Sequence, residues 1–158
     1  MLDEAVRLFR QNETRYRGAL ADAYVLKARL ALARGDRDAA RGNVGEALSV
    51  VGYPDRLSGV EAHRTLTSAA MIELEMERFG QVERYALEAL PMAETHARGV
   101  DTSAEVGEAL LALARARLAL GSEDGVEPSL ERALRCLTNG LGPEHPLTRE
   151  ARVLLDGI

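Results

Sequence analysis

The sequence predicts an all-α protein, an α-α superhelix of about three helical hairpins with an extra N-terminal helix and a C-terminal capping helix. The first reason is a unit of 17 residues that occurs three times, starting 42 and 44 residues apart, as Leu32–Leu48, Leu74–Leu90 and Leu118–Leu134. Self-similarity at this spacing is typical of stacked hairpins. The second reason is composition, because 46% hydrophobic but 4% aromatic residues favour close-packed helices over a β-sandwich. The third is that no stretch alternates apolar and polar residues over a useful strand length.

The chain is expected to form one repeat domain over residues 1–158. Its expected units are a partial repeat at 1–18, hairpins at 19–55, 56–99 and 100–142, and a capping helix at 143–158. The expected helices cover about residues 2–16, 19–34, 37–51, 59–78, 80–97 and 104–120, followed by a helix that ends near 138 and one that starts at 146.

In the first third of the chain the helix boundaries follow from glycine and aspartate. Gly18 is a weak break after an amphipathic first helix. Gly35 suits a left-handed C-cap, and Asp36 suits the N-cap of the next helix. Gly42 and Gly45 lie inside that next helix, at a cost of about 1 kcal/mol each relative to alanine. We therefore expect a neighbouring helix to approach them closely.

In the middle of the chain the boundaries follow from one proline and one polar connector. Pro91 removes a backbone donor and crowds the carbonyl four residues before it, so we expect a kink or an early end of the helix over 80–97. The connector at residues 98–102 precedes the next helix, and its N-cap is expected at Asp101, Thr102 or Ser103.

Prolines also position the last helices. Pro128 is tolerable if its helix starts late enough to place it in the first turn. Asn139-Gly140 is expected to end that helix. Pro146 is expected to open the final helix.

Small residues recur at equivalent places in the three units, which predicts close packing of the paired helices. The aligned positions are Ala28, Ala70 and Ala114, then Ala47, Ala89 and Ala133, with Leu32, Leu74 and Leu118 between them. We expect all nine to be core residues.

Two stretches carry a family resemblance. The first is Leu32, Gly35-Asp36, Ala40 and Ala47-Leu48, and the second is Gly125–Leu134 followed by Leu141–Thr148, with its Gly-Pro-Glu-His-Pro linker. Together they resemble the tetratricopeptide repeat family, in the long variant of kinesin light chains that is widespread in bacterial multidomain proteins. The resemblance covers about Leu20 to Leu155. It implies a non-catalytic scaffold that binds a protein or peptide, as a module of a larger regulatory or signalling protein.

In the resembling family the first helix of each hairpin lines a concave face and holds the ligand. The equivalent positions here are Asp22, Val25, Arg29, Arg64, Thr67, Met71, Glu108, Leu111 and Arg115. Arg29 and Arg115 are equivalent, and such a pair could hold an acidic segment by bidentate contacts. The alternative is a solvated face with local ion pairs. A clamp of Asn and Lys on a C-terminal carboxylate is disfavoured, because no Asn falls on a first helix.

No constellation for catalysis or metal binding is evident. His63, His96 and His145 lack carboxylate or Cys companions at ligand spacing, so His63 and His96 are interpreted as surface or packing residues and His145 as a turn or capping residue. Cys136 is expected to be a buried, unreactive thiol. We therefore expect no enzyme activity, no metal and no cofactor.

Charge and hydropathy limit the partners further. The net charge of −5 and pI near 5.3 argue against a nucleic-acid binder. No stretch approaches the roughly 20 apolar residues of a membrane span. A single cysteine fits a reducing cytoplasm, which is the predicted location.

The alternative to partner binding is self-association into a homodimer. Terminal hairpins expose stripes that a further repeat would cover. The expected stripes are Leu2, Val6 and Phe9 at one end and Val153, Leu154 and Ile158 at the other.

Overall fold

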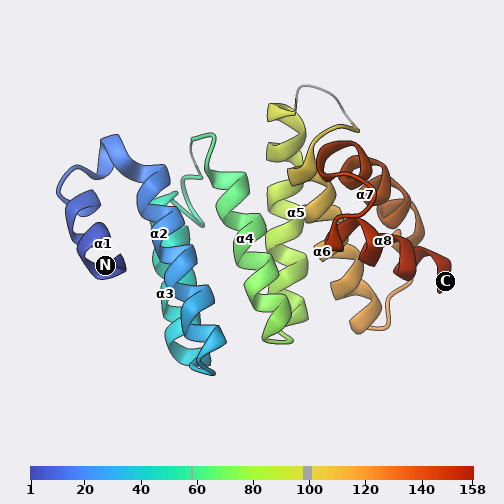
Figure 1. Cartoon of the computed structure of the whole chain (residues 1–158), viewed down its shortest axis with the longest axis horizontal. Coiled ribbons are helices and arrows are strands. Elements are labelled where there is room, and N and C mark those ends of the chain that lie inside the picture. The colour runs from blue at the N-terminus through green and yellow to red at the C-terminus, as the bar shows by residue number, and fades with distance from the viewer. Residues whose placement is uncertain (58, 98–100) are drawn as a thin grey trace.

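The structure is a computed structural model, and it describes residues 1–57, 59–97 and 101–158. These residues form helices and no strand, which confirms the all-α class (Figure 1). The helices are α1 (Leu2–Arg10), α2 (Glu13–Ala33), α3 (Arg37–Val50), α4 (Ala62–Glu75), α5 (Phe79–His96), α6 (Ala104–Ala119), α7 (Val126–Leu141) and α8 (Pro146–Asp156). The predicted boundary between the second and third units, at residues 99 and 100, lies outside the described residues.

The helices associate mainly with their neighbours in the chain. The most extensive contacts join α2 with α3, α4 with α5, and α6 with α7. The first helices of these pairs are α2, α4 and α6, and α4 contacts both α2 and α6. Figure 1 shows the elements following one another along the long axis, with α1 at one end and α8 at the other. This order places α2, α4 and α6 where they share one face.

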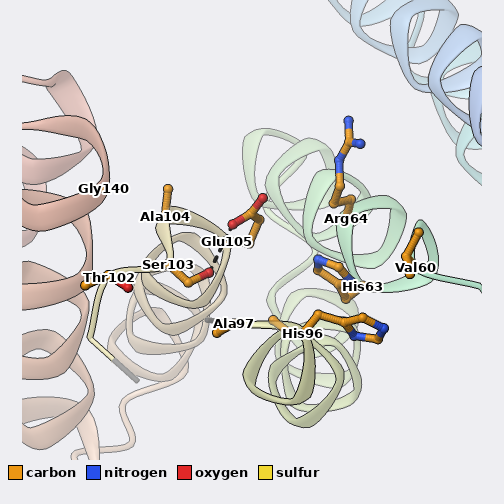
Figure 2. Close-up of a pocket in the computed structure, with 11 residues that line it drawn as sticks. Val60, His63, Arg64, His96, Ala97, Thr102, Ser103, Ala104, Glu105 and Gly140 are labelled. Atoms are coloured by element: carbon orange, nitrogen blue, oxygen red, sulfur yellow. Dashed lines mark hydrogen bonds between the residues drawn. The ribbon is translucent and has the colours of Figure 1, made fainter. Parts of the chain in front are cut away.

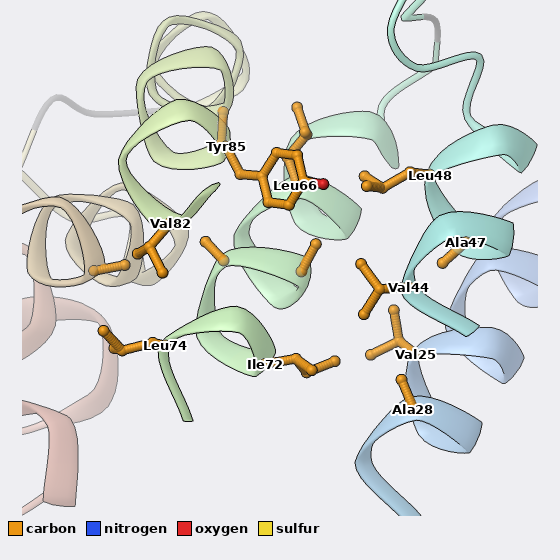
Figure 3. Close-up of a cluster of buried hydrophobic side chains, with 14 of the residues drawn as sticks. Val25, Ala28, Val44, Ala47, Leu48, Leu66, Ile72, Leu74, Val82 and Tyr85 are labelled. Carbon is orange, nitrogen blue, oxygen red and sulfur yellow. The ribbon is translucent and has the colours of Figure 1, made fainter. Parts of the chain in front are cut away.

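Buried alanines allow the close approach within each pair. All six aligned alanines are fully buried: Ala28, Ala47, Ala70, Ala89, Ala114 and Ala133. Leu74 is buried as expected, whereas Leu32 and Leu118 are half-buried at the margin of the core. Figure 3 shows how Val44 and Leu48 of α3 face Leu66 and Ile72 of α4 across the boundary between the first two pairs.

Several predicted helix ends are confirmed. Gly35 has a positive φ of 79°, and the Asp36 carboxylate accepts a hydrogen bond of 2.9 Å from the amide of Ala39. Ser103 caps α6 through the amide of Val106 at 3.3 Å. Pro146 opens α8, and Nδ1 of the His145 ring accepts from the amide of Leu147 at 3.3 Å. His145 therefore has the predicted capping role.

Other predicted ends are wrong. The first predicted helix is interrupted between Arg10 and Glu13, and α2 then runs through Gly18 with non-helical φ and ψ at Tyr16. Of the two outcomes expected at Pro91, the early end does not occur, and α5 continues to His96, next to the helix end predicted near residue 97. Likewise, α7 passes Asn139-Gly140 and ends at Leu141, before Gly142 with its φ of 93°.

The expected close approach at Gly42 and Gly45 is also wrong. A Cβ atom built at either position would meet nothing within 4 Å. Close approach occurs instead at Gly107, where a Cβ would lie 2.7 Å from Leu137 Cγ, and at Gly140, where it would lie 2.9 Å from the amide nitrogen of Ala104. The tight packing therefore lies between α6 and α7.

The two ends of the molecule differ in how far their apolar stripes are covered. The stripe of α1, made of Leu2, Val6 and Phe9, is buried or half-buried, and the Phe9 ring lies 5.6 Å from the ring of Tyr16. At the other end Leu154 is half-buried, but Val153 and Ile158 remain 69% and 61% exposed. None of the described helices is both long and apolar enough to cross a membrane.

Candidate functional groove

A hollow of about 560 Å³ lies between the first helices of the three pairs. Its wall on α2 carries Asp22, Val25, Leu26 and Arg29, its wall on α4 carries Arg64, Thr67 and Ser68, and its remaining lining is Ala104, Glu105, Glu108 and Leu141. Five of the eight site residues that we chose from the sequence thus line one hollow: Asp22, Arg29, Arg64, Thr67 and Glu108. Val25, at an equivalent position, lines it as well.

The other three predicted site residues lie elsewhere. Met71 is half-buried against the main core cluster. Leu111 is fully buried among side chains of α5 to α8, so it is unavailable to a partner. Arg115 is half-buried and pairs with Glu150 of α8 at 2.8 Å. The predicted pairing of Arg29 and Arg115 on one open wall is therefore not present.

Arg29 and Arg64 supply the positive charge of the hollow. Arg64 lies 3.7 Å from the carboxylate of Asp22, and both side chains are more than half exposed, so this ion pair is weak. Arg29 is exposed and forms no ion pair within the described parts of the chain. Exposed guanidinium groups of this kind remain able to pair with a carboxylate from a partner.

The opposite wall, on α6, carries two carboxylates. Burial raises the pKa of Glu108 above its usual value, and the nearby Glu105 adds to this, whereas Arg29 and His145 lower it. The pKa of Glu105 is lowered, chiefly by a hydrogen bond to the backbone, with a further contribution from the hydroxyl of Ser103. The hollow therefore has arginines on α2 and α4 and carboxyl groups on α6.

The groove continues into a second hollow of about 500 Å³, which shares Arg64, Ala104 and Glu105 with the first. Figure 2 shows His63 of α4 and His96 of α5 together on one side of it. Their rings are stacked, with centroids 5.3 Å apart and planes at 17°. Burial lowers the pKa of His63, and the neighbouring His96 lowers it further.

Two polar atoms of α4 are buried at this groove without a hydrogen-bond partner in the described structure. They are Nδ1 of His63 and Oγ1 of Thr67. The two side chains lie one helical turn apart, and each lines one of the two hollows. An unsatisfied buried polar group costs about 1–3 kcal/mol, so these two groups of α4 lower the stability of the fold.

Sequence reasoning missed the histidine pair because nothing in the sequence marks two histidines in different helices as neighbours.

Cys136, the one cysteine of the sequence, does not line the groove. Cys136 is buried as predicted, and burial raises the pKa of its thiol, which lowers the fraction of reactive thiolate. The described residues contain no group of three or more His, Cys, Asp or Glu side chains that could hold a metal ion.

No protein-family model matches the chain, and no curated protein matches it significantly. The function must therefore be inferred from the geometry and charge of the groove itself.

Proposed function

We propose that the chain is a non-catalytic scaffold of the tetratricopeptide type, in which three helical hairpins form a superhelix and a protein segment docks in the groove between α2, α4 and α6. The observation that carries this proposal is the gathering of Asp22, Arg29, Arg64, Thr67 and Glu108 around one hollow. Ordered contacts from α2 to α4 to α6 and the buried alanines inside each pair support the repeat architecture.

The charge of the groove indicates the kind of segment. Arg29 is without an ion pair in the described structure, and the Arg64 pair with Asp22 is long and exposed. A carboxylate of the partner would therefore gain an arginine at little cost, because no strong internal ion pair has to break. On α6, Glu108 is held near Arg29, which opposes the rise in its pKa caused by burial. The proposed partner is a protein segment with acidic side chains.

The test is a charge reversal in the groove. After a partner has been isolated by affinity purification and its docking segment made as a labelled peptide, fluorescence anisotropy would compare the wild type with Arg29→Glu and Arg64→Glu. We expect at least a tenfold loss of affinity in each variant, since a close ion pair becomes a like-charge contact. The matched control is Arg152→Glu, an exposed arginine of α8 outside the groove lining.

Equal affinities of Arg29→Glu and Arg152→Glu for the peptide would overturn the groove as the docking site. Circular dichroism of each variant would check that the helices are retained.

A second candidate function is self-association through the C-terminal end. It is favoured by the exposed Val153 and Ile158, and Ile158 also lines a hollow of about 460 Å³ together with Leu118 and Val126. An exposed apolar patch of this kind can bury itself against a second copy.

A further inference from the structure

A third hollow, of about 360 Å³, lies on α3, α5 and the end of α4, apart from the groove described above. It shares no lining residue with the groove. Both α3 and α5 pack on α4, but no Cα atom of α3 lies within 8 Å of one in α5. The gap between these two helices is therefore a cleft whose floor is the end of α4.

The wall of the cleft on α3 is one face of this helix, and its two glycines leave the backbone there without side chains. Asp38, Arg41, Gly42 and Gly45 line the cleft, and their spacing of three, four and seven residues places them on one side of α3. A Cβ atom at Gly42 or Gly45 would meet nothing within 4 Å. Packing inside the protein therefore does not account for either glycine, although both lower the stability of the helix.

The floor of the cleft carries a buried carboxyl group. Glu73 is 2% exposed, and Nη1 of Arg78 lies 3.1 Å from its Oε2 and 3.4 Å from its Oε1. The first contact is an ion pair without hydrogen-bond geometry, so Oε2 has no hydrogen-bond partner among the described residues. A carboxylate accepts about four hydrogen bonds, so Glu73 retains capacity for a further donor.

The mouth of the cleft carries a second guanidinium group. Arg41 is exposed, and its one ion pair in the described structure is a 3.4 Å contact with the exposed Asp38. Burial raises the pKa of Glu73, while Arg78 and Arg41 oppose this, so both arginines lie near the same carboxyl group. Tyr85 closes the far wall and is almost fully buried. Two guanidiniums at the mouth attract an oxyanion, and a buried acceptor below them requires a donor.

We propose that this cleft binds a small carboxylic acid that carries an amino or hydroxyl group beside its carboxylate. The carboxylate pairs with Arg41 and with the N–H groups of Arg78 other than those on Nη1, which contacts Glu73. The amino or hydroxyl group donates to Oε2 of Glu73, and the bare backbone at Gly42 and Gly45 leaves room for the molecule against α3.

Isothermal titration calorimetry with L-serine and L-lactate tests the proposal, with acetate and methylammonium as probes that carry one of the two groups. We expect at least one of the two-group probes to bind, and acetate and methylammonium to bind at least tenfold more weakly. Absence of binding by both L-serine and L-lactate up to about 10 mM would overturn the proposal.

A substitution that fills the cleft separates specific from unspecific binding. Gly42→Leu has room for its side chain in the cleft and removes a helix-breaking glycine, so the fold should persist. Gly80→Leu is the matched control, because Gly80 is a helical glycine of α5 whose Cβ would also meet nothing within 4 Å and which does not line the cleft. We expect at least a tenfold loss of affinity in Gly42→Leu and in Glu73→Gln, and no change in Gly80→Leu. Unchanged binding in Gly42→Leu would place the ligand elsewhere and overturn the assignment.

Discussion

Among the described residues, the buried side-chain polar atoms that lack a hydrogen-bond partner all belong to α4. His63 and Thr67 each bury a polar atom that has no hydrogen-bond partner in the described structure, and Glu73, further along, buries a carboxyl group. Such groups are costly in an apolar interior. They lie where hollows reach α4, a helix that contacts α2, α3, α5 and α6.

The first prediction concerns His63 and pH. Because burial lowers the pKa of His63 in the folded state, the unfolded state takes up the proton more readily as pH falls below the usual value near 6.5. The stability linked to His63 is thus complete above that value and is lost as pH falls through the folded-state pKa. One proton limits the slope to about 1.4 kcal/mol per pH unit. The test variant is His63→Phe, which retains a ring beside His96. Urea denaturation between pH 7.5 and 5.5 should show a smaller fall in the free energy of unfolding for this variant than for the wild type. Parallel pH profiles of the two proteins would contradict the prediction.

The second prediction compares two glycines in helices. Gly42→Ala should raise the free energy of unfolding by about 0.5–1 kcal/mol, because alanine favours the helix and its Cβ meets nothing within 4 Å. Gly107→Ala should lower it by about 1–3 kcal/mol, because its Cβ would lie 2.7 Å from Leu137 Cγ and 3.1 Å from Cys136 Cβ. Thermal and urea denaturation would measure the change in the free energy of unfolding of each variant. Changes of the same sign in both variants would contradict the packing seen around Gly42 and Gly107.

These residues also mark where sequence reasoning stops. The burial of Cys136 and of the aligned alanines could be predicted from helical periodicity, since each lies on an apolar face. The stacking of His63 on His96 could not, because it depends on how the start of α4 meets the end of α5. Gly42 and Gly45 carried a signal, but the sequence alone does not distinguish a glycine that faces a helix from one that faces a cleft.

At the scale of the helix, local chemistry predicts the ends well where a side chain or a glycine satisfies the free backbone groups. Asp36, Ser103 and His145 accept hydrogen bonds from the first turns of α3, α6 and α8. A helix breaker is a weaker guide: the early end allowed for at Pro91 does not occur, and α5 continues past the buried Ala93 to His96. Boundaries set by caps are therefore more reliable than boundaries set by helix breakers.

The third prediction tests one such cap. Asp36→Ala should lower the free energy of unfolding by about 1 kcal/mol, since the amide of Ala39 loses its acceptor at 2.9 Å. Asn12→Ala is the control, because Asn12 stands at the N-cap of α2 without a side-chain capping bond. Its substitution should change stability by less than about 0.5 kcal/mol. A comparable loss in both variants in urea denaturation would show that the cap at Asp36 is not the cause.

At the scale of the molecule, contacts between helices that are distant in the sequence position most of the residues that line the groove. Asp22, Arg29, Arg64, Thr67 and Glu108 meet because α2, α4 and α6 contact one another in order. Arg115 does not line the groove, and it pairs instead with Glu150 of α8. The two residues of that ion pair lie more than 30 positions apart in the sequence, so no periodicity indicates it.

The fourth prediction concerns association of whole molecules. Val153 and Ile158 are exposed at the C-terminal end, whereas the stripe of α1 is covered, so we expect any homodimer to form through α8. Two exposed side chains and a shallow hollow are far less than the roughly 800 Å² per partner of a stable interface. Light scattering should therefore give the monomer mass of 17.1 kDa at about 10 μM and a higher apparent mass near the millimolar range.

Negative charge introduced at the C-terminal end should prevent the increase in apparent mass near the millimolar range. Val153→Glu combined with Ile158→Glu should keep the monomer mass at every concentration, because two carboxylates would have to be buried to form the contact. Leu8→Glu combined with Leu30→Glu is the matched control, since both leucines are exposed at the opposite part of the molecule. A wild type that stays monomeric near the millimolar range would remove self-association as a function of this end, and an increase that survives the α8 substitutions would assign it to another surface.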